Sequence, residues 1–141
     1  MKIILNTDGG ARGNPGIAGA GAVIFDEAGK ILASDSQALG ETTNNEAEYQ
    51  AVMLGLKLVQ DNFGADKLKD LAVELRVDSE LIARQLKGQY KVKEDRLRVY
   101  YTQIKETIKT KFPNFNIAEI RREQNKEADA LANEAMDGAR P

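Results

Sequence analysis

The sequence predicts an α/β fold in which helices flank one five-stranded mixed sheet. Two observations carry this prediction. The first forty residues contain three apolar stretches separated by glycine-rich or tight turns, a pattern typical of antiparallel strands. Stretches with helical periodicity then alternate with two further short strands, as in helices packed on a sheet. With 141 residues, of which 42% are hydrophobic, we expect one domain spanning residues 1–141.

Each strand is predicted where an apolar or alternating stretch ends at turn-forming residues. The tight turn 27–30 separates the second and third strands. The predicted strands are residues 2–8, 18–27, 31–39, 71–77 and 115–120. Helical periodicity predicts the remaining elements, and Pro113 is expected to end the third helix. The predicted helices are residues 44–62, 80–87, 94–111 and 125–136.

Composition excludes several kinds of chemistry. The chain has no His and no Cys, which excludes Ser-His-Asp and Cys-His catalysis, the usual zinc sites and disulfides. The net charge of −2 means that a nucleic-acid site must be a local patch. No stretch approaches the roughly 18 apolar residues of a membrane span, and the N-terminus leads directly into a strand. We therefore expect no signal peptide, no membrane association and a cytoplasmic monomer.

Two aspartates are predicted at the ends of strands. Asp8 follows an apolar strand and precedes Gly9 and Gly10, and Asp78 follows the fourth strand. Ligands of mixed sheets gather outside the carboxyl ends of central strands, which favours a functional role for both. The alternatives are a turn residue for Asp8 and a helix cap for Asp78. If the two strands are neighbours, the carboxylates lie side by side and require a cation between them.

Periodicity separates two glutamates in the helix predicted at 44–62. Glu46 and Thr43 form a capping box, and the stripe that continues from Glu46 is mostly polar, so we expect Glu46 on a wet face. Glu48 is expected to face the sheet, where a carboxylate is costly unless it is paired or bound to a metal. Its stripe contains Val52, Gly55 and Val59. The alternative is an exposed Glu48 favoured by the helix dipole.

A fourth carboxylate, Asp129, lies near the start of the last helix, after Asn125 as a plausible N-cap. Taken alone, it is better explained as structural, because acidic residues favour helix N-termini. The four carboxylates together form a ligand set that suits Mg²⁺, with Mn²⁺ as an alternative, since Mg²⁺ takes carboxylate oxygens and water. A pair of such ions about 3.5–4 Å apart can stabilise both the attacking and the leaving oxygen in phosphodiester cleavage.

The motifs that carry these carboxylates also resemble a known family. They are Thr7-Asp8-Gly9-Gly10 with Gly13-Asn14-Pro15-Gly16, Thr42-Thr43-Asn44-Asn45 with Ala47-Glu48, Val77-Asp78-Ser79, and Asn125 with Ala128-Asp129. In this order they resemble ribonuclease HI over essentially the whole chain. The resemblance implies a ribonuclease H-like fold. It also implies hydrolysis of the RNA strand of RNA–DNA hybrids by a metal-activated water, leaving 5′-phosphate and 3′-hydroxyl ends. Asp8, Glu48, Asp78 and Asp129 would be the metal-binding catalytic carboxylates.

Other residues resemble the positions at which this family contacts its substrate. Asn14, Asn44 and Asn45 suit recognition of the 2′-hydroxyl in the shallow minor groove of a hybrid. Without the resemblance they would be explained as a turn former and helix caps. Arg12 is a candidate phosphate contact, although an exposed Arg needs no special explanation.

The chain departs from the best-known bacterial pattern in two places. Residues 87–93 are short where those enzymes insert a basic helical handle, although residues 87–98 keep five basic residues against two acidic ones. This segment either follows a phosphate backbone or forms a solvated helix face. The loop before Asp129 lacks the family's His, and Arg122 and Glu123 are candidate substitutes. Both departures resemble the handle-less group of archaea and some bacteria.

Two other functions compete with a hybrid nuclease. A non-catalytic binding module of the same fold would lack at least one of the four carboxylates, and all four are present. A resolvase or integrase of the wider superfamily is disfavoured by the Asn44-Asn45 pair and by the Gly-Asn-Pro-Gly turn.

Overall fold

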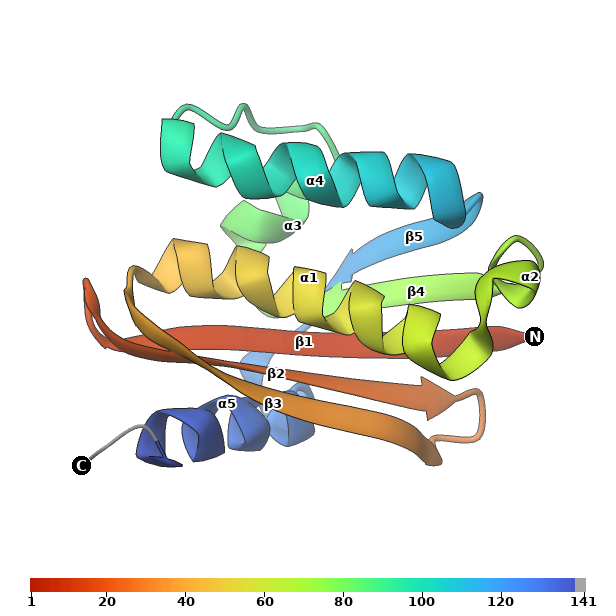
Figure 1. Ribbon diagram of the computed structural model, residues 1–141, viewed down its shortest axis with the longest axis horizontal. Helices are drawn as coiled ribbons and strands as arrows, with labels where there is room; N and C mark the ends of the chain where they lie inside the picture. The colour runs from red at the N-terminus through yellow and green to blue at the C-terminus, as the bar shows by residue number, and fades with distance from the viewer. Residues whose placement is uncertain (139–141) are drawn as a thin grey trace.

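A computed structural model describes residues 1–138 and shows one mixed sheet between two layers of helices (Figure 1). The five strands lie in the order β3-β2-β1-β4-β5. Neighbouring pairs among the first three are antiparallel, and β4 is parallel to both β1 and β5. This arrangement confirms the predicted five-stranded mixed sheet. The strands are β1 (Lys2–Gly13), β2 (Gly16–Asp26), β3 (Ile31–Thr42), β4 (Ala72–Val77) and β5 (Asn114–Glu119).

Helices cover both faces of the sheet. Three helices, α1 (Asn44–Phe63), α3 (Glu80–Leu86) and α4 (Asp95–Lys111), lie on one face, and α5 (Lys126–Gly138) lies on the other (Figure 1). Two short helices, α2 (Ala65–Leu68) and η1 (Arg122–Gln124), were not predicted from the sequence. None of the helices within residues 1–138 is long and apolar enough to cross a membrane.

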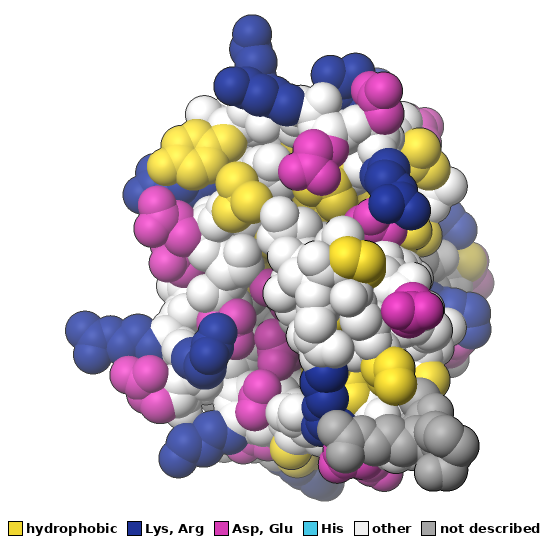
Figure 2. Space-filling model, turned by 90° about the vertical axis from the view of Figure 1, so that its left-hand side faces the viewer, with side chains coloured by type: hydrophobic (Ala, Val, Ile, Leu, Met, Phe, Trp, Pro, Cys, Tyr) yellow, Lys and Arg dark blue, Asp and Glu magenta, His cyan; other side chains and the backbone are white. Residues whose placement is uncertain are grey.

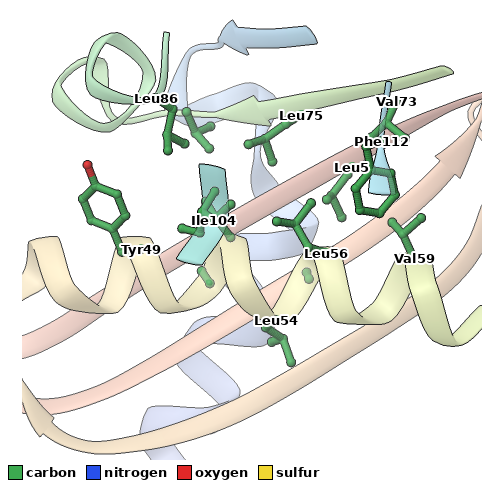
Figure 3. Close-up of a cluster of buried hydrophobic side chains, with 14 of the residues drawn as sticks. Leu5, Tyr49, Leu54, Leu56, Val59, Val73, Leu75, Leu86, Ile104 and Phe112 are labelled. Carbon is green, nitrogen blue, oxygen red and sulfur yellow. The ribbon is translucent and has the colours of Figure 1, made fainter. Parts of the chain in front are cut away.

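The main core fills the space between the sheet and the layer of α1, α3 and α4. Figure 3 shows Leu5 and Leu75 of the sheet facing Leu56 of α1, with Ile104 and Phe112 from the α4 region completing the cluster. These side chains are at most 2% exposed. Their burial removes apolar surface from water and fixes the position of α1 over β1 and β2.

The parallel pairing of β1 and β4 places the two predicted strand-end aspartates together. The last paired residues are Asn6 and Arg76, and Asp8 and Asp78 each follow two residues later. Both carboxylates therefore lie beyond the same end of the β1–β4 pairing, next to the start of α1. This placement agrees with the expected position of a ligand site at the carboxyl ends of central strands.

Two strand ends were predicted wrongly, those of β1 and β3. We expected β1 to end at Asp8, whereas it continues to Gly13 and pairs with β2 along that whole length. Gly9 lies within the strand, and close packing explains why this position is a glycine. A Cβ atom there would lie 2.1 Å from the carbonyl oxygen of Ala47. This glycine allows α1 to approach β1 and does not form a turn. In the same way, β3 extends to Thr42, beyond the predicted Leu39.

The environment of Glu46 was also predicted wrongly. Its backbone N–H donates to the Thr43 hydroxyl, as expected for a cap, at 3.2 Å. Its side chain is buried, however, because α4 packs over the start of α1. The carboxylate accepts a hydrogen bond from the Thr42 hydroxyl and lies 3.4 Å from Nε of Arg96. Arg96 of α4 therefore compensates the charge of Glu46, which helical periodicity alone had predicted to be exposed to solvent.

Candidate active site

Three carboxylates from three different elements converge beside the open end of the β1–β4 pairing. Asp8 comes from β1, Glu48 from the second turn of α1, and Asp78 from the residue after β4. One carboxylate oxygen from each lies within 4.8 Å of the other two. No salt bridge within residues 1–138 engages any of the three. This arrangement suits a hard divalent cation, which takes oxygen ligands.

The packing of α1 on β1 fixes the position of Glu48. The backbone N–H of Gly9 donates to Oε1 of Glu48 at 2.6 Å. That hydrogen bond is short because the missing side chain of Gly9 lets the strand backbone touch the helix. The stripe below Glu48 faces the sheet as periodicity predicted. Its members Val52, Gly55 and Val59 are all buried.

Asn125 joins the site in a way that the sequence did not reveal. Its backbone carbonyl accepts from the N–H of Asp129, in keeping with the predicted N-cap position. Its fully buried side-chain Nδ2 also donates to the carbonyl of Thr7 at 2.9 Å and to Oδ2 of Asp78 at 3.0 Å. Asn125 thus ties the start of α5 to β1 and orients one of the three carboxylates. The only signal in the sequence was its place in the last motif.

Burial and mutual repulsion dominate the electrostatics of the cluster. Burial, followed by the nearby Glu48 and Asp78 charges, raises the pKa of Asp8 to about 9. Burial also raises the pKa of Glu48 to about 7, although the hydrogen bond from Gly9 and the charge of Arg122 act in the opposite direction. Without a cation, the site therefore holds on to protons that ordinary carboxyls release near pH 4. A bound divalent cation would reverse this balance.

Asp129 lies beside Asp8 but outside the group of three. It contributes to the raised pKa of Asp8 through both a side-chain hydrogen bond and its charge. Asp8 and Asp129 line the same groove of about 240 Å³, together with Arg12, Asn44 and Arg122. The structure therefore brings all four predicted carboxylates to one place, with Asp129 at the edge of the cluster.

Two of the predicted substrate-contacting asparagines also have structural partners. Oδ1 of Asn14 accepts from the backbone N–H of Asn44 at 3.0 Å, and Oδ1 of Asn44 accepts from the N–H of Ala11 at 2.9 Å. These two bonds join the β1–β2 hairpin to the first turn of α1. They use only the acceptor oxygens, and within residues 1–138 the side-chain NH₂ groups of Asn14 and Asn44 donate no hydrogen bond. Asn45 is half-buried in the same first turn.

The basic candidates have different surroundings. Arg12 is held by α5, where its guanidinium pairs with Asp137 and donates to Oδ1 of Asn133. Arg122, in η1, is exposed and close enough for its charge to lower the pKa of Glu48, while Glu123 is exposed beside it. Figure 2 shows this side of the molecule, with acidic side chains gathered in a furrow and Lys and Arg side chains around it.

Comparisons with known proteins agree with this fold. Residues 6–135 match the family described as reverse transcriptase-like. The solved structure of LC11-RNase H1, isolated from compost by a metagenomic approach, is 53% identical, with a TM-score of 0.93 over 98% of this chain and 97% of that one. LC11-RNase H1 in complex with an RNA/DNA hybrid is matched equally well, with a TM-score of 0.93 and 51% identity over 97% of this chain and 98% of that one. The chain therefore belongs to the type 1 ribonuclease H family.

The similar curated proteins are longer than this chain. Ribonuclease HI of Halobacterium salinarum is 40% identical over 132 residues, which cover 94% of this chain and 63% of that protein. A bifunctional protein of Mycobacterium tuberculosis is 39% identical over 140 residues, which cover 99% of this chain and 36% of that protein. The chain thus spans about a third of the length of the mycobacterial relative and less than two thirds of the archaeal one.

Proposed function

We propose that the protein is an endoribonuclease that hydrolyses the RNA strand of RNA–DNA hybrids and leaves 5′-phosphate and 3′-hydroxyl ends. The observation that carries this proposal is the convergence of Asp8, Glu48 and Asp78 within 4.8 Å, with Asp129 beside them. The family membership and the hybrid bound to LC11-RNase H1 support the choice of substrate. The absence of His and Cys leaves no other nucleophile–base pair of the common kinds.

The four carboxylates would hold two Mg²⁺ ions, with Mn²⁺ as a substitute. The donor set fits such ions, because it consists of oxygen ligands that form no salt bridge within the described residues. Bound there, the ions would supply Lewis acidity toward the scissile phosphate and activation of the attacking water. The raised pKa values of Asp8 and Glu48 are the expected state of such ligands before a cation binds.

The remaining residues would hold and orient the substrate. Asn125 fixes the rotamer of Asp78, so that this ligand is in place before binding. The free amide donors of Asn14 and Asn44, together with Asn45, would read the 2′-hydroxyls that distinguish RNA from DNA. Arg122 would hold the phosphate that is cleaved, and Arg12, through its ties to α5, would contact a neighbouring phosphate.

Cleavage of end-labelled nucleic acids tests this function. The substrates are an RNA–DNA hybrid, duplex DNA, duplex RNA and both single strands, each with Mg²⁺, with Mn²⁺ and with EDTA. We expect cleavage of the RNA strand of the hybrid only when a divalent cation is present. Undiminished cleavage in EDTA, or equal cleavage of duplex DNA, would contradict the proposal.

Three further expectations accompany this function. We propose that residues 1–141 act as one domain, as a monomer and in the cytoplasm. Size-exclusion chromatography with light scattering would test the monomer, and limited proteolysis would test the single domain. Imaging of the tagged protein in its own cells would test the location.

A further inference from the structure

The connection between α3 and α4 is an irregular basic segment, residues 87–94, which we call the arm. It contains neither helix nor strand. Its three lysines, Lys87, Lys91 and Lys93, are exposed, and no salt bridge within residues 1–138 engages them. Figure 1 shows the arm above the start of α1, on the same side of the molecule as the β1–β2 hairpin. Uncompensated positive charge on that side suits a polyanion.

A buried chain of hydrogen bonds connects the arm to α1. The hydroxyl of Tyr49 donates to Oε1 of Gln85 at 2.6 Å, and Nε2 of Gln85 donates to the carbonyl of Lys91 at 3.4 Å. Tyr49 is 0% exposed and Gln85 is 4% exposed. Figure 3 shows the Tyr49 hydroxyl pointing from α1 toward α3, where Leu86 lies. These two hydrogen bonds thus connect the buried Tyr49 of α1 to the backbone of the arm.

The arm has other attachments, but they lead to α3 and α4. Arg98 of α4 donates to the carbonyls of Val92 and Lys93, and the N–H groups of Gln89 and Tyr90 donate to the carbonyl of Arg84. Within residues 1–138, Tyr49–Gln85 is the one side-chain hydrogen bond between α1 and α3. Together with the Glu46–Arg96 ion pair between α1 and α4, this bond sets the position of the arm relative to α1, the helix that carries Glu48.

The chemistry of the pair favours a positioning role over simple packing. A hydroxyl and an amide are costly to bury, and a pair of apolar side chains of similar size would fill the same space without that cost. Burial raises the pKa of Tyr49, so its hydroxyl remains a donor at any working pH. A fully satisfied buried polar pair specifies one arrangement of the surrounding elements.

We propose that the buried Tyr49–Gln85 pair is a positioning device that holds the arm at a fixed place relative to the carboxylates, so that its lysines contact the phosphate backbone of the bound hybrid. This inference rests on the proposed function and deepens it. Both side chains of the pair are buried, and neither belongs to the carboxylate cluster. Loss of the pair should therefore weaken hybrid binding and leave the chemical step largely intact.

The test compares matched variants in steady-state cleavage of the hybrid. Tyr49→Phe removes only the hydroxyl, and Gln85→Met removes only the amide from a side chain of similar length. Each should raise KM by about three- to tenfold with kcat within about twofold of wild type, as expected for the loss of one buried hydrogen bond. Tyr101→Phe is the control. It removes a hydroxyl that lies close to Tyr49 but takes no part in the hydrogen bonds from Tyr49 through Gln85 to Lys91. Its KM should match that of wild type.

A reference variant measures what the arm itself contributes. Neutralising Lys87, Lys91 and Lys93 together, each to Gln, should raise KM more than it lowers kcat. It should also reduce the slope of log affinity against log salt by about one unit per lost phosphate contact. Tyr49→Phe and Gln85→Met should shift the slope in the same direction by less. A variant that only loses stability would not change this slope.

Binding of a fluorescent hybrid in EDTA, followed by anisotropy, separates this inference from the proposed function. Wild type that cuts the hybrid, with variants that keep its KM, affinity and salt slope, would overturn the positioning role alone. Wild type that binds the hybrid without cutting it under any metal would overturn the function, while the affinities of the variants would still decide the role of the pair. Wild type that does neither would overturn both.

Discussion

Two carboxylates on α1 stand two residues apart in opposite surroundings. Glu46 is buried between α1 and α4, where the Thr42 hydroxyl and the Arg96 guanidinium compensate its charge. Glu48 lies among Asp8 and Asp78, where its neighbours add negative charge. Both carboxylates are removed from water, but within the described residues only Glu46 forms a salt bridge, whereas Glu48 has only the nearby charge of Arg122. At the cluster of Asp8, Glu48 and Asp78, a bound divalent cation would supply the counter-charge.

The largest expected effect tests this contrast by activity. Glu48→Gln or Asp78→Asn should abolish cleavage of the hybrid, because each removes ligand charge from the proposed cation site. Glu46→Gln should keep near wild-type kcat, because that carboxylate faces α4 and not the cluster. Steady-state rates at saturating Mg²⁺, with circular dichroism to verify folding, measure the difference. Equal losses in Glu46→Gln and Glu48→Gln would break the comparison.

A smaller loss of activity is expected at the loop before α5. Arg122 lines the groove with Asp8 and Asp129, so Arg122→Ala should lower kcat while leaving cation affinity largely unchanged. A permanent positive charge there can hold the cleaved phosphate, whereas Glu123 would repel it. Glu123→Ala is the matched control and should change kcat less. Single-turnover and steady-state rates that match wild type for both variants would show that the loop is only a connector.

The acidic cluster should also affect stability without a cation, and the sign follows from the pKa of Asp8. Its folded value of about 9 exceeds the ordinary value of 3.8, so the folded state binds this proton more tightly than the unfolded state. The contribution of Asp8 to stability is therefore complete below pH 3.8 and is lost as pH rises toward about 9.

Asp8→Asn removes this titration. In EDTA, the Tm of Asp8→Asn minus that of wild type should grow from pH 5 to pH 9. Saturating Mg²⁺ should reduce or reverse the difference, because only the wild-type ligand set binds the ion tightly. Thermal unfolding at several pH values measures both effects. A difference that stays constant with pH would show that folding does not raise the pKa of Asp8.

The smallest expected effect concerns the compensated region. Glu46→Gln keeps an acceptor for the Thr42 hydroxyl but loses the charge that faces Arg96. Because the side chain of Arg96 is 77% exposed, the pair is well screened. The expected loss is about 1 kcal/mol of unfolding free energy or less. Urea unfolding measures this cost, and Arg96→Gln should give a similar loss if the ion pair is its source.

The sequence alone determined the elements and indicated the chemistry of the candidate site. Alternating and helical periodicities defined the five strands and four longer helices to within three residues, except that β1 ends five residues beyond its predicted end. Local burial patterns reflect which face meets the core. The same periodicity distinguished Glu48 from Glu46 and predicted that Glu48 faces the sheet. The order of the motifs indicated the family. The lack of His and Cys restricted the candidate metal ligands to oxygen atoms.

Only the tertiary structure decided how distant residues compensate one another. Helical periodicity predicted that Glu46 is exposed, because the pattern describes a single helix. It contains no information on the packing of α4 over the start of α1. Gly9 looked like a turn residue until the contact with Ala47 showed that it admits a helix. The side-chain bonds of Asn125 to Thr7 and Asp78, and of Tyr49 to Gln85, join residues 36 to 118 positions apart. Such pairings depend on how elements pack, and no local pattern in the chain encodes them.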